Sequence, residues 1–262
     1  MQHDGKIFKM VLYAAETMVK SGSETYRAED TIKRMLASRG IFNISTFVSP
    51  TVIIIGDNTQ NGVCFIQNID KRSSNLSRIE LVNNLSRSFV NHELNTTEAF
   101  NRLKRINEQS LYPYWLIMLG CTTGCAIFSI LIGGNFTDFI ATMIASSISF
   151  HTSEKISEIS NTQFLGFFIS ALIVTFVAIC LNKIGLGKNL DSTIVGSVLP
   201  LVPGVALTTG VRDFMFGDLL SGMARVMEAA TIAIAIAFGV GCSLTFFNYL
   251  GGILWVGLIY FY

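Results

Sequence analysis

The chain has 262 residues and a formal net charge of +1; half of its residues are hydrophobic and only 14% are charged. That charged share is low for a soluble protein, where about a quarter is usual, and the near-neutral charge excludes the basic signature of a nucleic-acid partner. The charges are also uneven, since residues 1–111 hold fourteen of the nineteen Lys and Arg and eleven of the eighteen Asp and Glu. This asymmetry predicts a cytosolic α+β domain over residues 1–111 and a transmembrane helical domain over residues 112–262.

The first residues, MQHDGKIFKM, lack the apolar core and small-residue cleavage site of a signal peptide. We therefore expect a cytoplasmic N-terminus on a multi-pass protein of the cell (inner) membrane. None of the five cysteines has a Cys-x-x-Cys partner or a histidine at metal-ligand spacing. The sequence thus predicts no metal site, no disulfide and no cofactor.

The first region begins with two helical patterns. Apolar residues at helical spacing predict a helix over residues 6–20, and Ser23 is a candidate cap for a second helix over about 24–38. Residues 44–69 are rich in β-branched and aromatic side chains around a turn at residues 56–62, which predicts a small antiparallel sheet. Two further helices are expected at 77–91 and 96–109, with His92 between them as a surface residue.

Basic residues followed by Tyr112, Tyr114 and Trp115 mark the entry of the first span from the cytosolic side. We expect about five crossings of the membrane, with the fourth broken at Pro200–Gly204. Their predicted ranges are Tyr114–Ile132, Phe136–His151, Phe164–Leu181, Ser192–Thr209 and Leu219–Phe247. The apolar tail Gly251–Tyr262 is too short to span, since about 20 residues are needed, and is expected at the interface or against the bundle.

Asp138 and His151 lie at the two ends of the second, short span. Ionisable residues within a membrane segment are candidates for a proton path. The competing interpretation is that both residues sit at headgroup level and serve no transport role.

Two prolines interrupt the fourth span. Pro200 and Pro203 remove amide donors, so the carbonyls of Gly196 and Leu199 lose their usual helical partners. Hydrocarbon offers no water to such groups, so a broken helix at membrane depth must be packed in protein or line a cavity. Transporters place binding sites at such breaks, although a proline-kinked helix with no ligand remains the alternative.

Arg225 and Glu228 are three residues apart at the start of the fifth span, where they can pair or point at one cavity. A row of small residues at intervals of four passes through Arg225, from Ser221 to Gly241. Such rows let helices approach closely, so this helix is expected to pack on another, with the broken helix as the first candidate. The alternative is that Arg225 lies shallow enough to reach the interface.

The stretch LVPGVALTTGVRDFMFGDLLSGMAR, residues 201–225, resembles the signature of the threonine/serine exporter (ThrE) family, L-V-P-G-x-x-L-x-x-x-x-x-D followed by G-D-L-x-x-G-x-A-R. The resemblance implies export driven by the proton motive force, of threonine and serine in the namesake and of a dicarboxylate such as succinate in a split, two-subunit branch. The chain stops at Tyr262, where fused members continue. This implies that the chain forms a hetero-oligomer with a separately encoded second membrane module. Membrane lipid is expected to contact both subunits.

Residue type and position give the candidate site. The break at Pro200, Pro203 and Gly204 would present backbone groups to the substrate, with help from polar and cationic side chains. Those side chains are Thr208, Thr209, Arg212 and Arg225. Asp213 or Glu228 would couple the proton if burial raises its pKa.

Two other functions are weighed against export. The chain could be a regulatory or scaffold subunit that does not itself transport. It could also be a membrane-anchored hydrolase with its chemistry in residues 1–111, but that region has no nucleophile–base motif and no metal-ligand spacing.

Overall fold

The computed structural model describes residues 2–59, 63–70, 72–108, 112–160 and 162–259. Two compact units divide the chain. The first, here called the mixed unit, contains residues 1–111 together with Gly204–Glu228, and the second, the helical unit, contains Tyr112–Pro203 and Ala229–Tyr262. This grouping differs from the predicted division at residue 111, because the motif-bearing stretch packs with the first region.

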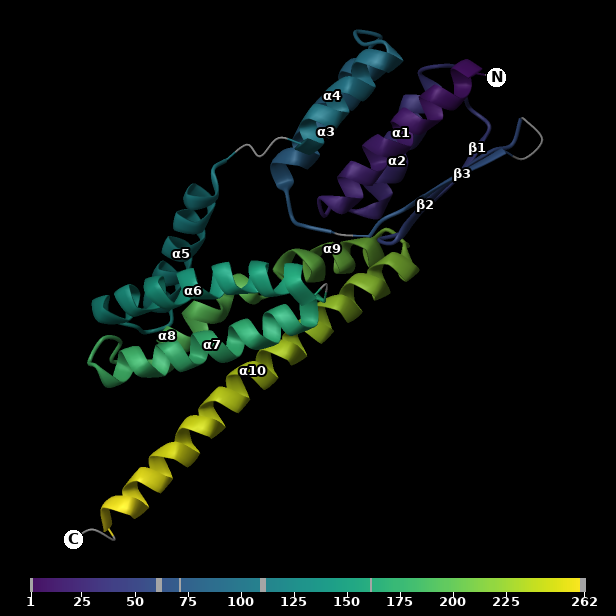
Figure 1. Cartoon of the computed structure of the whole chain (residues 1–262). Helices are drawn as coiled ribbons and strands as arrows, with labels where there is room; N and C mark the ends of the chain where they lie inside the picture. Colours follow the sequence, from purple (N-terminus) through teal and green to yellow (C-terminus); the bar gives the residue numbers. More distant parts are fainter. Residues whose placement is uncertain (1, 60–62, 71, 109–111, 161, 260–262) are drawn as a thin grey trace. The chain divides into compact units, whose positions relative to one another are not determined.

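The mixed unit contains the elements predicted for residues 1–111 (Figure 1). The helices are α1 (Gln2–Lys20), α2 (Thr25–Ala37), α3 (Leu76–Val90) and α4 (Thr96–Glu108), joined by α9 (Gly204–Met215) and the first turns of α10 (Leu219–Ile259). The predicted Ser23 cap is wrong, because Glu24 occupies the cap position of α2 and makes no side-chain capping bond. His92 is exposed between α3 and α4, as predicted.

The three strands form one antiparallel sheet in the order β1-β2-β3, as the sequence pattern predicted. They are β1 (Ile44–Val48), β2 (Val52–Asp57) and β3 (Val63–Asn68); residues 60–62 of the predicted turn lie outside the described residues. Alternate residues of β2, Ile53 and Ile55, are fully buried, because successive side chains of a strand point to opposite faces. They join a core built mainly from α1 and α2.

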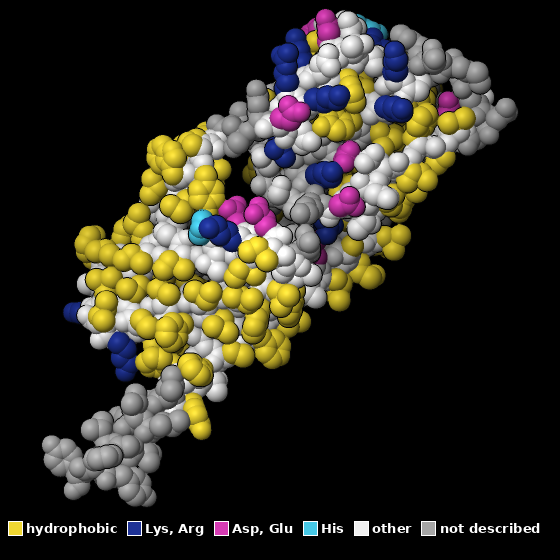
Figure 2. All heavy atoms as spheres, in the orientation of Figure 1, with side chains coloured by type: hydrophobic (Ala, Val, Ile, Leu, Met, Phe, Trp, Pro, Cys, Tyr) yellow, Lys and Arg dark blue, Asp and Glu magenta, His cyan; other side chains and the backbone are white. Residues whose placement is uncertain are grey.

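The helical unit consists of α5 (Tyr114–Leu131), α6 (Phe136–Ser160), α7 (Gln163–Lys183), α8 (Leu190–Val198), a 3-10 turn, η1 (Leu199–Leu201), and the remainder of α10. Its core is rich in alanine and β-branched side chains, such as Ala145, Ala171 and Val174. Small side chains allow membrane helices to pack closely. Figure 2 shows hydrophobic side chains covering the visible face of α6 and α7, whereas charged side chains gather over the mixed unit.

Three helices among the described residues are long and apolar enough to cross a membrane, and a fourth span is counted if the interrupted pair α8–α9 is one crossing. The three are α5, α7 and Leu219–Tyr249 of α10. The protein is therefore a mostly helical membrane protein with a small sheet. The predicted second span is part of α6, a 25-residue helix that continues through polar residues to Ser160 and is not among these candidates.

The predicted break is present. Helix α8 ends at Val198, η1 contains Pro200, and α9 begins at Gly204 after Pro203. The two carbonyls that lose their usual partners find nearer ones: Gly196 O accepts from Leu199 N, and Leu199 O accepts from Val202 N at 3.1 Å. The tighter turn thus satisfies the backbone groups that the prolines would otherwise leave unpaired.

Helix α10 is longer than predicted, because it continues to Ile259 through most of the segment expected to form a separate tail. The row of small residues does not keep to one face. Ser221, Arg225 and Ala229 are buried, whereas Ala233 and Gly241 are exposed. A step of four residues exceeds the 3.6-residue turn, so a row at that interval winds around the helix.

Candidate functional site

The mixed unit contains a hollow of about 480 Å³ at the side of α9. Thr208, Thr209 and Arg212, all predicted site residues, line it together with Val205. The remaining lining comes from the turn after α1, from α2 and from α3: Gly22, Glu24, Arg27, Leu76, Ile79, Glu80 and Asn83. The hollow therefore combines the family-motif stretch with residues that lie more than 120 positions earlier.

Glu24 organises the two cations of this hollow. Its side chain is only 6% exposed, Oε1 forms an ion pair with Arg212 Nη1, and Oε2 lies 3.2 Å from Arg27 Nη1. Burial raises the pKa of Glu24, but its backbone hydrogen bond and the two arginines outweigh that effect and leave the pKa below its ordinary value. Glu24 is consequently ionised at neutral pH and holds both guanidinium groups in place.

A buried ion pair lies beside the hollow. Asp213, fully buried on α9, places Oδ2 at 3.0 Å from Nε of Arg225 on α10, whose side chain is 6% exposed. Arg225 also donates from Nη2 to the carbonyl of Ser23 at 2.7 Å and from Nη1 to Thr209 Oγ1 at 3.3 Å. The guanidinium group of Arg225 is therefore buried within the mixed unit.

Asp213 also fixes the start of α2. Its Oδ1 accepts the backbone N–H of Thr25 at 3.2 Å, and Asp218 Oδ2 accepts the Thr25 hydroxyl at 3.1 Å. The first amides of a helix have no partner within the helix, so a carboxylate supplied from elsewhere satisfies one of them. The two aspartates of the motif stretch thereby join α9 and its following turn to the start of α2.

Glu228 forms an ion pair with Arg72. Its carboxylate lies 2.9 Å from Arg72 Nη2, at side-chain exposures of 24% and 27%. Of the two candidates for proton coupling, Asp213 is therefore the fully buried one, and Glu228 belongs to a half-exposed ion pair.

Glycines allow α9 and α10 to approach closely. A Cβ added to Gly222 would lie 2.9 Å from the carbonyl oxygen of Gly210, and one added to Gly210 would lie 3.1 Å from Cβ of Arg225. The packing of α10 on the helix after the break was predicted. The contact uses Gly210 and Gly222 together with Arg225 of the predicted row.

Apart from Glu228, the predicted site residues fall into three groups. Thr208, Thr209 and Arg212 line the hollow, and Asp213 and Arg225 form the buried pair beside it. Pro200, Pro203 and Gly204 are not among its lining residues and instead set where α9 begins.

Sequence reasoning missed the lining residues Glu24, Arg27, Glu80 and Asn83. The only local signal was the three-residue spacing of Glu24 and Arg27, which suits an ion pair on a helix. Their proximity to α9 has no signal in the sequence.

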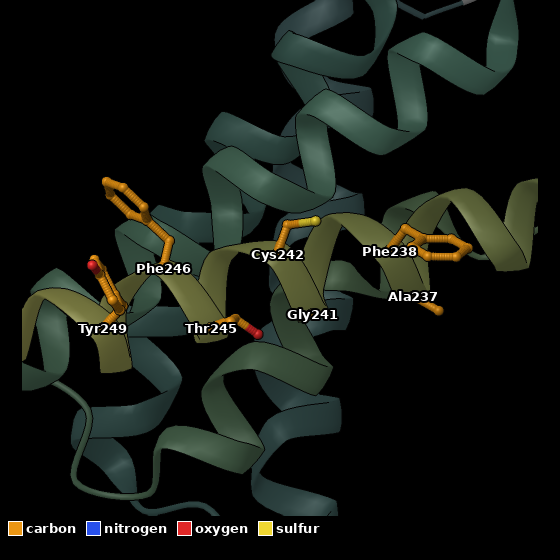
Figure 3. A pocket seen from close by; sticks show the side chains of 7 residues that line it. All are labelled: Ala237, Phe238, Gly241, Cys242, Thr245, Phe246 and Tyr249. Carbon is orange, nitrogen blue, oxygen red and sulfur yellow. The ribbon is translucent and has the colours of Figure 1, made fainter. Parts of the chain in front are cut away.

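A larger hollow, of about 660 Å³, lies along α10 (Figure 3). All its lining residues come from this helix, and none is Asp, Glu, Lys, Arg or His: Ala237, Phe238, Gly241, Cys242, Thr245, Phe246 and Tyr249. A surface without charged groups suits an apolar contact rather than a charged metabolite. No group of three or more His, Cys, Asp or Glu residues in the described part of the chain is placed to hold a metal ion.

Asp138 and His151 do not form a pair within the helical unit. Asp138 is fully buried and accepts the backbone N–H groups of Asn135 at 2.6 Å and Asn189 at 2.9 Å. His151 is exposed, and its Nδ1 lies 3.1 Å from the hydroxyl of Tyr114. Asp138 thus caps α6 and secures the loop before α8.

The comparisons with known proteins agree on one family. Residues 9–247 match the ThrE family of threonine/serine exporters. The "Probable succinate transporter subunit YjjP" of Klebsiella aerogenes is 22% identical over 94% of this chain and 95% of its own length. The protein of the same name from Escherichia coli K12 is 24% identical over 89% of this chain and 92% of its own length.

A third relative is longer. The "Probable threonine/serine exporter" of Mycobacterium tuberculosis is 21% identical over 92% of this chain, which spans only 46% of that protein. No solved structure matches the chain. Because the family match extends over nearly the whole chain, this protein belongs to the ThrE threonine/serine exporter family.

Proposed function

We propose that this chain is a subunit of a secondary exporter that binds a small carboxylate-bearing metabolite in the hollow beside α9. The family is one of transporters rather than enzymes. The observation that carries the proposal is the convergence of Arg212, Arg27, Thr208 and Thr209 on one hollow immediately after an interrupted membrane helix. In the cell, residues 1–111 lie in the cytoplasm and the apolar helices in the inner membrane.

Arg212 is the group we assign to the carboxylate. Its side chain is 56% exposed, and Glu24 occupies one of its terminal nitrogens. A guanidinium has five N–H donors in a fork that matches a carboxylate, so donors remain for a ligand. The N-terminal half of α9 also lines the hollow, through Val205, Thr208 and Thr209. Unpaired amides at the N-terminus of a helix favour an anion.

The charges of the hollow favour a zwitterion. Arg27 and Arg212 are balanced by Glu24 and Glu80, so a dicarboxylate would add two negative charges to a neutral site. An amino acid such as threonine or serine adds none. Among the substrates in the names of the relatives, the hollow therefore supports threonine or serine over succinate.

Asp213 is the carboxylate we assign to proton coupling. It is fully buried, and its ionised form is held by Arg225 and by the amide of Thr25. Protonation would remove the charge that attracts Arg225 and weaken the bond to Thr25. Export driven by the proton motive force would then link proton uptake to release of the start of α2 from α9.

A second membrane module completes the exporter in this proposal. Two relatives of similar length are named as subunits, and the threonine/serine exporter named above is about twice as long as the matched region. The family resemblance of the motif stretch leads to the same expectation.

The test is counterflow in proteoliposomes that contain the chain and its second module. Labelled threonine should accumulate against unlabelled threonine, serine should compete, and succinate should compete poorly. Arg212→Gln should lower uptake at limiting threonine by about tenfold or more, because a charge-assisted hydrogen bond is lost. The matched control is Arg102→Gln, an exposed arginine of α4 that does not line the hollow.

Unchanged uptake by Arg212→Gln would contradict the binding site. Full transport by the second module alone would contradict the proposed role and favour a regulatory or scaffold subunit.

A further inference from the structure

We propose that Glu80 of α3 is the specificity-determining residue that receives the ammonium group of the substrate. The inference rests on the proposed function and assigns one side of the same hollow to a cation. It gives the first region of the chain a direct part in substrate selection.

Glu24 is not free for this role. Both of its carboxylate oxygens already lie against guanidinium groups, Oε1 against Arg212 and Oε2 against Arg27. Its 4% exposure leaves little room for a third cation. Glu24 therefore acts as a positioning residue that holds the two arginines.

Glu80 differs in each of these respects. It is exposed, lines the same hollow, and has no ion pair with any described residue. Leu76, Ile79 and Asn83 line the hollow from the same face of α3, at the spacing of three and four residues that aligns side chains on a helix. An unpaired carboxylate thus faces the space in which Arg212 presents its remaining donors.

The threonine hydroxyls line the same hollow as Glu80. Thr208 Oγ1 donates to the carbonyl of Gly204 at 2.9 Å, and Thr209 Oγ1 donates to that of Val205 at 2.7 Å. Since each hydroxyl has a single hydrogen, Thr208 Oγ1 is left as an acceptor toward a ligand, whereas Thr209 Oγ1 already accepts from Arg225 Nη1 at 3.3 Å and keeps one lone pair. They suit an ammonium or hydroxyl donor and offer nothing to a second carboxylate.

The hollow therefore has acceptors that only a ligand with its own donors can use. An amino acid supplies an ammonium group for Glu80 and a carboxylate for Arg212. A dicarboxylate would place its second charge near Glu80, where like charges repel. Glu80 consequently selects for the zwitterion and against the dianion.

The test compares wild type, Glu80→Gln and Glu80→Lys in the reconstituted complex, with labelled threonine and labelled succinate as the two probes. Glu80→Gln should raise the KM for threonine by about 10- to 100-fold with little change in kcat, the effect of losing a hydrogen bond to a charged group. Glu80→Lys should also make succinate a better competitor of labelled threonine than it is in wild type. Glu108→Gln, an exposed glutamate of α4 outside the hollow, is the matched control.

Three outcomes would overturn the assignment. The threonine KM of Glu80→Gln could equal that of wild type, or the variant could lose threonine and succinate to the same degree. Either result, obtained with an active wild type, would contradict the role assigned to Glu80 without contradicting the proposed function. A wild-type complex that transports neither threonine nor succinate would contradict both the proposed function and the role assigned to Glu80.

Discussion

At the scale of single residues, the buried ion pair of Asp213 and Arg225 determines how strongly substitutions at these two positions destabilise the protein. Removing one partner of a buried pair leaves an uncompensated charge and costs about 3–5 kcal/mol. We expect Arg225→Met to destabilise the protein by about that amount. The double variant Asp213→Leu/Arg225→Met should be destabilised by less than the sum of the two single variants, because no lone charge is left.

The measurement is a double-mutant cycle from denaturant unfolding in mixed micelles. The double variant still leaves the Thr25 amide and the Ser23 carbonyl without these partners. Some loss, about 1–3 kcal/mol for each unsatisfied group, should therefore remain. Additive effects of the two single variants would show that the two charges do not stabilise each other.

Glu24 gives the stability a defined pH dependence. Its pKa in the folded protein is lower than its ordinary value of 4.5, so its ionised form stabilises the fold above that value. The stabilisation is lost as the pH falls through the lowered pKa. Wild type should therefore be more stable than Glu24→Gln at pH 7, and the difference should shrink below about pH 4.5.

Thermal unfolding in detergent between pH 7 and pH 3 measures this difference. A constant gap between the two proteins across the range would contradict a role for the Glu24 charge, and a gap that widens on acidification would reverse the expected sign.

At the scale of elements, local patterns predicted the helices and strands of residues 1–111 because their apolar periodicity is strong. The prolines likewise predicted the interruption before α9. Helix ends were predicted less well: α6 continues through the polar residues 152–160, and α10 continues past Asn248. Backbone hydrogen bonding does not require apolar side chains, so a helix can continue beyond the hydrophobic pattern that predicted it.

The candidate site was predictable only in part, for a related reason. Thr208, Thr209 and Arg212 share one short helix with the motif, so their grouping follows from sequence spacing. The bond between Asp213 and Thr25 joins residues 188 positions apart. No periodicity or capping rule reports such a contact, and Glu24, Arg27 and Glu80 were missed for that reason.

At the scale of the whole molecule, the exposed face of α10 offers a surface for the proposed second module. Gly241 lies between the larger Phe238 and Phe246 along the hollow in Figure 3, and the small Ala237 lies next to Phe238. A Cβ added to Gly241 would meet nothing within 4 Å among the described atoms. Small residues flanked by large ones let a second membrane helix approach closely.

Gly241→Leu should therefore prevent assembly with the second module, because the larger side chain would fill the space that the partner helix needs. Co-purification of the two subunits from membranes, with this chain tagged, measures the loss. Gly124→Leu on α5 is the matched control, since Gly124 is also exposed with open space around it and lies within an apolar helix. Assembly should survive in the control and fail in Gly241→Leu, whose own abundance in the membrane should match wild type. Assembly by Gly241→Leu but not by Gly124→Leu would place the partner on α5. Assembly by both variants would indicate that this face of α10 contacts lipid instead of the partner.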